Sequence, residues 1–509
     1  MQRHTSQMSR STSRRAFVRT AALGSAALVA APRLFSQSAN LAKKPNLLVF
    51  LPDQFRADAL TGPAAAQVHA PNLHKLASQS VVMERAYVTQ PVCVPSRSSL
   101  FSGTWPHANG AVDNKSILSL QYKCFPEMLD DSDYRTGYFG KWHLGDEYSA
   151  QRGFQEWLST EEYPKSAKGS EKIRGQSDYT KFLISKGYKP KPKKGQSFDR
   201  NMVTKLPFEL SKPKFLETHA CDFLEKHKND PFVLFVAFYE PHPPYGGPFN
   251  KEHPLDSFSL DPSSADVLGD DAPLRYRLLQ ERFQKQTSDQ GKLKEIKQRY
   301  LGLIHEIDLS IGAILARLES LGLADQTNIV MTSDHGDMMG AHGLLGKTVM
   351  FEQSSRIPYM LRIPNQRTFQ YPHPISHIDF APTMLELMGR TPSAQCPGRS
   401  RLSLIRGETA APEPIFAEWC GYTMDMKTQS RLATEAQTKE AFAESTRTII
   451  TPDGWKLSLR DKDKNELYNL KDDPDERHNL FSSADKEKIS SLTGAIHQWQ
   501  EKTGDTLKL

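Results

Sequence analysis

The stretch Asn46-Leu47-Leu48-Val49-Phe50-Leu51 is a continuous apolar run, and Pro52-Asp53-Gln54 follows it directly. An apolar run of this length is typical of a strand that is buried on both faces of a parallel sheet. Two further runs, 232–238 and 328–332, have the same character and precede the polar segments 239–242 and 333–337. Because ligands bind at the carboxyl ends of strands in open α/β sheets, these polar segments predict a functional site there.

Helical patterns lie between these strands. The clearest has apolar residues spaced by three or four from Leu301 to Leu318 and ends before Gly322. The alternation predicts an α/β fold with a mostly parallel, mixed sheet flanked by helices. The segment from about 161 to 205 is rich in Lys, Gly and Ser, and we expect a solvated surface insertion there.

The pattern of predicted elements changes near residue 410. Short strand-like pieces at 447–450, 455–457 and 466–470 surround the turn Pro452-Asp453-Gly454, and a helical pattern covers 484–502. The sequence therefore predicts a catalytic domain over 43–410 and a smaller α+β subdomain over 411–509.

The formal charge of +6 comes from the first residues of the 509-residue chain. Residues 1–38 hold six Arg and no Lys, Asp or Glu, so without them 59 basic residues face 59 acidic ones. Because residues 39–509 have no net formal charge, the chain has no overall positive charge that would attract it to nucleic acid. This leader, with Arg14-Arg15, a short apolar run and Ser36-Gln37-Ser38, resembles a twin-arginine export signal. We expect a periplasmic or secreted protein without stable membrane insertion.

The five cysteines include no CxxC pair, which excludes zinc clusters of the finger type. Cys124, Cys221, Cys396 and Cys420 are interpreted mostly as packing residues, and their pairing stays open. Cys93 lies in a different context, Cys93-Val94-Pro95-Ser96-Arg97 with Leu100 and Gly103. This segment resembles the signature of the formylglycine-dependent sulfatases, the type I sulfatases of the alkaline phosphatase superfamily.

The resemblance implies that a maturation enzyme oxidises Cys93 to formylglycine. Once hydrated, this aldehyde has two hydroxyls on one carbon, so one attacks sulfur and the other later expels sulfate. Pro95 suits the first turn of a helix, whose N-terminus favours negative charge at position 93. Arg97, one turn further along, is expected to hydrogen-bond the modified side chain.

A second segment, Gly140-Lys141-Trp142-His143, resembles another sulfatase motif. On an extended segment Lys141 and His143 point the same way. By resemblance, Lys141 binds a sulfate oxygen and His143 handles a proton of the formylglycine hydrate.

The pairs Asp53-Gln54 and Asp334-His335 resemble the divalent-metal ligands of the family, with oxidised Cys93 completing the site. Hard oxygen ligands favour Ca²⁺. A common family pattern has Asp-Asp and Asp-Asn at these places; here Gln54 lowers the negative charge and His335 adds a softer nitrogen, so Mn²⁺ is the alternative. The Gln/His combination resembles the branch that contains choline sulfatases and phosphonate monoester hydrolases.

His242 and Lys347 match family residues that contact the bridging oxygen of the ester. His242 is preferred as the acid that protonates the leaving alcohol because its reference pKa is near neutrality. His342 is interpreted as structural. Trp419 and Tyr422 either contact a sugar or close the interface between the domains.

These observations predict a sulfuric-ester hydrolase that acts on a small-molecule or oligosaccharide sulfate ester, most simply a sulfated carbohydrate. Two alternatives stay open: a phosphonate monoester hydrolase or phosphodiesterase of the same superfamily, and an inactive glycan-binding homologue in which Cys93 is never oxidised.

Overall fold

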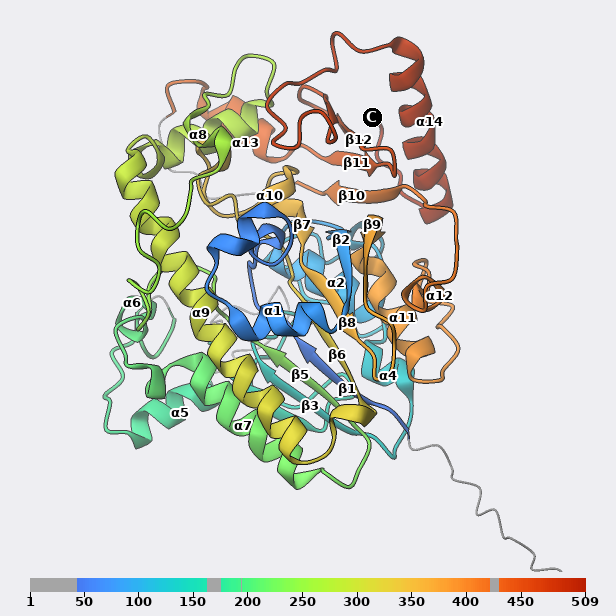
Figure 1. Ribbon diagram of the computed structural model, residues 1–509. Coiled ribbons are helices and arrows are strands. Elements are labelled where there is room, and N and C mark those ends of the chain that lie inside the picture. Colours follow the sequence, from blue (N-terminus) through green and yellow to red (C-terminus); the bar gives the residue numbers. More distant parts are fainter. Residues whose placement is uncertain (1–43, 163–174, 194, 422–429) are drawn as a thin grey trace, which may run out of the picture. The chain divides into compact units, whose positions relative to one another are not determined.

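The computed structural model describes residues 44–162, 175–193, 195–421 and 430–509 (Figure 1). The predicted twin-arginine signal, residues 1–38, lies outside the described residues. Residues Lys44–Leu509 form one compact unit. None of the helices in the described ranges combines the length and the apolar composition that a membrane span requires.

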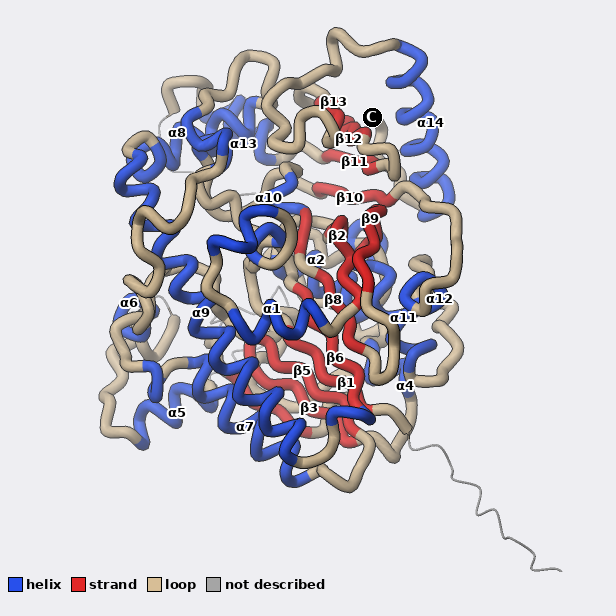
Figure 2. Tube along the Cα trace, in the orientation of Figure 1, coloured by secondary structure: helices blue, strands red, loops and turns tan. Residues whose placement is uncertain are grey.

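A mixed sheet of nine strands forms the centre of this unit (Figure 2). Its strands are β1 (Asn46–Phe50), β2 (Val81–Tyr87), β3 (Arg135–Gly140), β4 (Glu156–Ser159), β5 (Phe232–Ala237), β6 (Thr327–Thr332), β7 (Arg356–Ile357), β8 (Tyr359–Arg362) and β9 (Phe369–Ser376). The order is β4-β3-β5-β1-β6-β8-β2-β7, and β9 pairs with β2. The five strands from β4 to β6 run parallel, whereas β8 is antiparallel to both of its neighbours.

Helices cover both faces of this sheet. Alternate residues of β1 enter opposite cores: Leu47 and Val49 lie in one, Leu48 and Phe50 in the other. The helices are α1 (Pro71–Ser78), α2 (Cys93–Ser102), α3 (Pro106–Asn109), α4 (Phe125–Leu129), α5 (Asp178–Ser185), α6 (Arg200–Val203), α7 (Lys212–Lys226), α8 (Leu274–Thr287), α9 (Gln290–Ser320), α10 (Glu352–Ser355), α11 (Phe380–Leu387), α12 (Leu402–Ile405), α13 (Glu435–Phe442) and α14 (Lys486–Thr503). Helices α2, α4 and α11 pack on the first core, and α1, α7 and α9 pack on the second (Figure 1).

A second, antiparallel sheet follows near the C-terminus. It consists of β10 (Ile415–Trp419), β11 (Thr446–Ile450), β12 (Trp455–Arg460) and β13 (Glu466–Asn469) in that order. Leu492 and Ile496 of α14 pack on Leu457 and Leu467 of this sheet. The backbone N–H of Glu418 on β10 donates to the Thr89 carbonyl oxygen at 2.7 Å, so the small sheet contacts the segment that leads into α2.

The predicted α/β class, the mostly parallel sheet and the small C-terminal sheet are confirmed. The three predicted strands occur as β5, β1 and β6, side by side in the sheet. The predicted insertion over 161–205 is wrong in part: Glu161 is fully buried, and Tyr179 and Leu183 of α5 form a separate apolar cluster with Phe198. The aromatic residues of that cluster are scattered among the lysines. The run of lysines therefore led to the wrong expectation that the whole segment is exposed to solvent.

Candidate active site

The carboxyl ends of four neighbouring parallel strands bring most of the predicted site residues to one edge of the sheet. Because β3, β5, β1 and β6 are consecutive in the sheet, the residues that follow them are neighbours in space. These residues are Lys141 after β3, His242 after β5, Asp53 and Gln54 after β1, and Asp334 and His335 after β6. The backbone N–H of Asp53 donates to the Phe238 carbonyl oxygen at 3.1 Å, which extends the sheet register into the site.

Cys93 is the first residue of α2 and its side chain faces this edge. The residue is 1% exposed. Its Sγ lies 3.0 Å from Nζ of Lys347, 3.2 Å from Nε2 of His335 and 3.6 Å from Nζ of Lys141. Burial and Asp53 would raise the pKa of the thiol, but the nearby charges of Lys141 and Lys347 hold that pKa well below its usual value. The helix start and the two lysines therefore favour negative charge at this position.

The other cysteines, Cys124, Cys221, Cys396 and Cys420, are also free.

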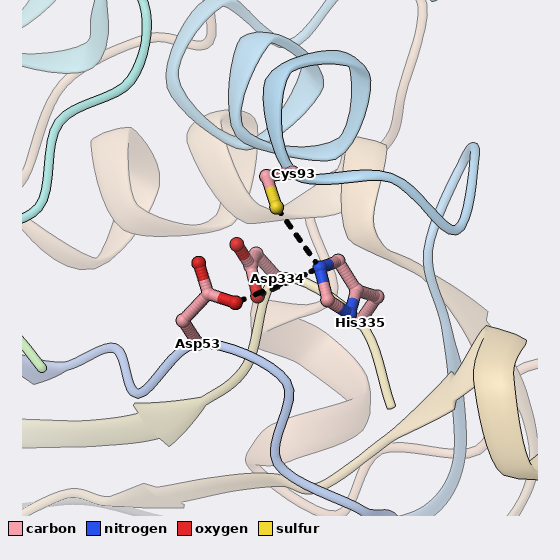
Figure 3. A group of neighbouring side chains, drawn as sticks. All are labelled: Asp53, Cys93, Asp334 and His335. Carbon is pink, nitrogen blue, oxygen red and sulfur yellow. Dashed lines mark hydrogen bonds and ion pairs between the residues drawn. The ribbon is translucent and has the colours of Figure 1, made fainter. Parts of the chain in front are cut away.

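Asp53, Cys93, Asp334 and His335 form a group of possible metal ligands (Figure 3). Their ligand atoms all lie within 4.8 Å of one another, and all four residues are buried. Oδ1 of Asp53 is buried and has no hydrogen-bond partner among the described residues. Nδ1 of His335 lies 2.9 Å from the Gly336 carbonyl oxygen, which leaves the Nε2 lone pair facing Cys93. A carboxylate oxygen without a hydrogen bond, 3.7 Å from an imidazole nitrogen whose ring is held by a backbone carbonyl, fits a divalent cation.

Two cations hold the carboxylates of this group. The Arg97 Nε–H donates to Asp334 Oδ2 at 2.7 Å, and Nη2 lies 3.4 Å from Asp53 Oδ2. Lys141 Nζ also donates to Asp53 Oδ2. Burial raises the pKa of Asp53, but Lys141 and the other basic groups around it together outweigh burial and keep the pKa well below its usual range. Arg97 thus binds both acidic ligands, while its contact with the modified side chain of Cys93 stays a prediction.

Lys141 and His143 both face Cys93, although the segment is not a regular strand there. β3 ends at Gly140, and His143 has a φ of 64°. Trp142 between them packs into the core against Phe101, with ring centroids 4.9 Å apart. His143 hydrogen-bonds the Cys93 side chain, and burial together with Lys141 lowers the pKa of His143 to about 4. A neutral imidazole next to Cys93 can accept a proton.

Glu147, which no sequence motif singled out, holds this segment. Its Oε1 accepts from the backbone N–H of His143 at 2.6 Å, and its Oε2 accepts from that of Trp142 at 3.2 Å. Two backbone donors on one buried carboxylate hold the irregular turn that follows Lys141.

His242 and Lys347 approach the site from two different loops. Lys347 Nζ donates to Oε1 of Gln54 at 2.9 Å as well as contacting Cys93. Burial and the charge of Lys347 lower the pKa of His242 well below its usual value. His242 is therefore neutral near pH 7, which weakens the preference for it as the acid, although a bound anion would raise its pKa again. His342 is buried and stacks on Phe351 at 4.1 Å, in agreement with a structural role.

Asp337 is a second residue that the sequence did not single out. Its Oδ2 accepts from Nε2 of Gln54 at 2.5 Å and from the Tyr245 hydroxyl at 2.6 Å. Its Oδ1 accepts from the backbone N–H groups of Met339 and Gly346. Because the Gln54 amide donates to Asp337, its oxygen faces Lys347 and the possible metal ligands. Asp337 therefore sets the orientation of Gln54 and holds the loop that carries Lys347.

A mixed α/β sheet with acids, lysines and a helix-borne cysteine at one edge is the arrangement expected of a hydrolase of the alkaline phosphatase superfamily, and the comparisons with known proteins support this class. Residues 45–390 match the sulfatase family, and residues 340–502 match the family described as N-sulphoglucosamine sulphohydrolase, C-terminal. The chain belongs to the sulfatase family and is a sulfuric-ester hydrolase. This family generally uses a formylglycine and a divalent metal, and the Asp53 group is a possible set of ligands for one.

Three similar proteins, each distant in sequence, match about nine tenths of this chain. An N-acetylglucosamine-6-O-sulfatase of Bacteroides thetaiotaomicron is 25% identical, covering 91% of this chain and 87% of its own. Phosphonate monoester hydrolase SpPMH from Silicibacter pomeroyi has a similar structure, with a TM-score of 0.72, 20% identity and coverage of 91% and 96%. A structure in complex with its substrate D-glucosamine-2-N,6-O-disulfate gives a TM-score of 0.68 at 21% identity, covering 91% and 99%. These two structures share the fold of this chain.

Proposed function

We propose that this chain releases sulfate from an O-sulfated carbohydrate, using a formylglycine derived from Cys93 and a bound Ca²⁺, with Mn²⁺ as the alternative. The observation that carries the proposal is the buried donor set around Cys93: Asp53, Asp334 and His335 surround one position, and two lysines flank it. A relative that acts on N-acetylglucosamine 6-O-sulfate and a similar structure that binds a sulfated glucosamine support the substrate class.

Each of these steps of the proposed hydrolysis has a residue of this chain assigned to it: binding of the sulfate ester, positioning of the acidic ligands and transfer of a proton. Lys141 and Lys347, which lie within 3.6 Å of Cys93 Sγ, bind the oxygens of the sulfate ester. Arg97 keeps Asp53 and Asp334 in position as acidic ligands. When bound between Asp53, Asp334 and His335, a divalent cation would neutralise sulfate charge, and a hydrated formylglycine at position 93 would supply a nucleophile with a second hydroxyl for release. His143, neutral because of its lowered pKa, accepts the proton that this second hydroxyl gives up.

Departure of the alcohol needs a positive or proton-bearing partner at the bridging oxygen. The contact of Lys347 Nζ with Cys93 Sγ at 3.0 Å supports this role for Lys347, and we expect His242 to share it when a bound anion raises its pKa. A cavity adjoins His242 and is lined by Arg200, Lys212, Tyr239, Glu240 and Glu306 among others. Its volume of about 30 Å³ holds one or two water molecules, so we expect at most a single hydroxyl of the leaving alcohol to reach it.

Trp419 is not part of that binding surface. Its side chain is 1% exposed and packs with Val92 and Met350, and the Arg275 guanidinium lies 4.1 Å from its ring centroid. Of the two roles considered for Trp419, the structure thus agrees with closure of an interface; Tyr422 lies outside the described residues.

A screen of sulfated monosaccharides and glycan fragments, read as released sulfate, tests the substrate class. Release of sulfate from none of them would contradict it.

Replacement of Cys93 tests the nucleophile. Cys93→Ser offers one hydroxyl, so we expect at most a single transfer of sulfate to the protein and no turnover, whereas Cys93→Ala transfers none. Intact mass of the native enzyme checks the modification itself, since an unoxidised thiol stays alkylatable. Full turnover by Cys93→Ser would overturn the proposal, and an alkylatable thiol in an inactive protein would support the glycan-binding alternative.

Hydrolysis of phosphonate or phosphate esters is the second candidate. The similar fold of a phosphonate monoester hydrolase and the Gln54/His335 pair favour it. Rates on matched aryl sulfate and aryl phosphonate esters separate the two: we expect the sulfate ester to have the higher kcat/KM. A higher value for the phosphonate would reverse the assignment.

We also propose that residues 1–38 direct twin-arginine export and that the catalytic and C-terminal parts meet near residue 410. Replacing Arg14 and Arg15 by Lys should retain the protein in the cytoplasm with its leader uncleaved. Export of this variant at the normal level would contradict the export route.

A further inference from the structure

Outside the active site, three donor side chains from separate parts of the chain meet: His69, Glu252 and His305. One ligand atom from each lies within 4.8 Å of the other two. Nδ1 of His69 is 3.2 Å from Oε1 of Glu252, and Nε2 of His305 is 4.0 Å from the same oxygen. We propose that these side chains form a second cation site, separate from the catalytic one, that binds Zn²⁺.

His305 is the fixed member of the site. It lies on α9, and its side chain is 8% exposed. Its Nδ1 lies 3.0 Å from the backbone carbonyl oxygen of His69, so this nitrogen carries the proton and donates it there. Nε2 then keeps its lone pair, on the side of the ring that faces Glu252. A backbone carbonyl bonded to the second ring nitrogen is a common way to orient a metal-binding histidine.

The backbone of His69 is held from both sides. Its carbonyl accepts from His305, and its N–H donates to Nε2 of His253 at 2.8 Å. The side chains of His69 and Glu252 are 55% and 35% exposed, so they can adjust while their attachment points stay fixed. At present the rings of His69 and His305 stack, with centroids 4.6 Å apart. Because imidazole lone pairs lie in the ring plane, His69 turns out of this stack when it shares an ion with His305.

The donor chemistry selects the metal. Two imidazole nitrogens and one carboxylate oxygen suit Zn²⁺, which binds at about 2.0–2.2 Å and therefore separates its tetrahedral ligand atoms by about 3.4 Å. The observed separations of 3.2 and 4.0 Å lie on either side of that value. Ca²⁺ takes six to eight oxygen ligands and does not fit this set. Three protein ligands leave the fourth position to water.

Such an ion would join segments that also carry catalytic residues. His69 lies in the connection between β1 and α1, and Glu252 follows β5, so each segment begins at a strand that ends in the active site. Asp308, on α9 like His305, accepts from the backbone N–H of Leu73 at 2.7 Å and so holds the start of α1. We therefore expect Zn²⁺ to stabilise the fold without taking part in the hydrolysis.

Zinc binding to the full-length protein, saturated with Ca²⁺ beforehand, tests the site. Equilibrium dialysis with metal analysis should find one Zn²⁺ per chain that binds at least about tenfold more weakly to His69→Ala and Glu252→Gln. His497→Ala, which removes an exposed histidine on α14, should bind zinc like the native chain. Asp334→Asn, altered at the catalytic site, should also retain this zinc.

Two further results complete the test. Zn²⁺ should raise the Tm of the native chain and of His497→Ala but not of His69→Ala, since a ligand stabilises only the state that binds it. Near-UV circular dichroism checks that both exposed-ligand variants are folded. Equal zinc affinity in the native chain and in both variants would overturn the site, as would zinc that is lost only in Asp334→Asn.

Discussion

The two donor clusters of this molecule differ in how they are held. The catalytic group around Cys93 is fully buried, and its carboxylates are fixed by Arg97 and Lys141 and by strand ends. The cluster of His69, Glu252 and His305 has one buried member and two exposed ones, held through backbone hydrogen bonds. The comparison teaches that charge pairs inside the protein fix the first cluster, whereas the exposed side chains of the second are free to adjust to an ion.

Arg97→Met should have the largest effect on stability. It leaves the buried carboxylate of Asp334 without its guanidinium partner, and breaking a buried pair costs about 3–5 kcal/mol. Urea denaturation measures the change in the free energy of unfolding. Arg299→Met, which removes an exposed partner of Glu295 on α9, should cost less than about 1 kcal/mol. Similar losses in both variants would show that the catalytic group is not organised by its charge pairs.

Lys347→Met should lower kcat by about 10²–10³-fold on alkyl sulfates, because a cation at the leaving oxygen is lost. An aryl sulfate has a better leaving group and should lose much less. Comparing both substrates in steady-state kinetics separates help to the leaving group from binding of the anion. A loss that is independent of the leaving group would assign Lys347 to anion binding alone.

Asp337→Asn should weaken binding of the catalytic cation by about 10–100-fold, because the Gln54 amide is no longer held with its oxygen toward the site. Calorimetric titration of Ca²⁺ measures this effect independently of turnover. Tyr245→Phe removes one of the four hydrogen bonds to the same carboxylate and should cause a smaller loss. Asp270→Asn, which changes an exposed carboxylate, is the control. Unchanged affinity in Asp337→Asn would remove its positioning role.

His69→Ala should have the smallest effect when zinc is absent. Its side chain is largely exposed, and substitutions of that kind change the free energy of unfolding by less than about 0.5 kcal/mol. His305→Ala loses a buried hydrogen bond to the His69 carbonyl and should cost about 1–3 kcal/mol. Urea titrations without metal compare the two. A large decrease in the free energy of unfolding of His69→Ala would mean that the side chains of His69, Glu252 and His305 already stabilise the fold without an ion.

The parts of the fold that could be predicted are those in which one residue pattern decides the structure. The strands β1, β5 and β6 are continuous apolar runs, and each ends in polar residues that meet at one edge. The start of α9 at Gln290 was not predicted, because Leu293 and Ile296 are the only large apolar residues among its first ten and do not make a clear helical pattern.

The residues of the active site that could be predicted are likewise those that belong to a local sequence pattern. Cys93, Lys141 and Asp334 belong to local motifs, so their neighbourhood could be predicted from their resemblance. The role of Asp337 depends on a loop in which Met339 and His342 adopt positive φ values, a conformation that the sequence does not indicate. His69 and Glu252 are 183 residues apart, and only the packing of three segments brings them together.

The contact of Trp419 with Val92 has a consequence for shortened versions of the protein. Val92 immediately precedes Cys93, and the backbone of Thr89 in the same segment pairs with β10. A fragment that stops at residue 410 would open this flank of the nucleophile to water and remove the partner of an otherwise unpaired carbonyl. Attempts to produce a minimal catalytic fragment should therefore retain β10 and the strands that support it.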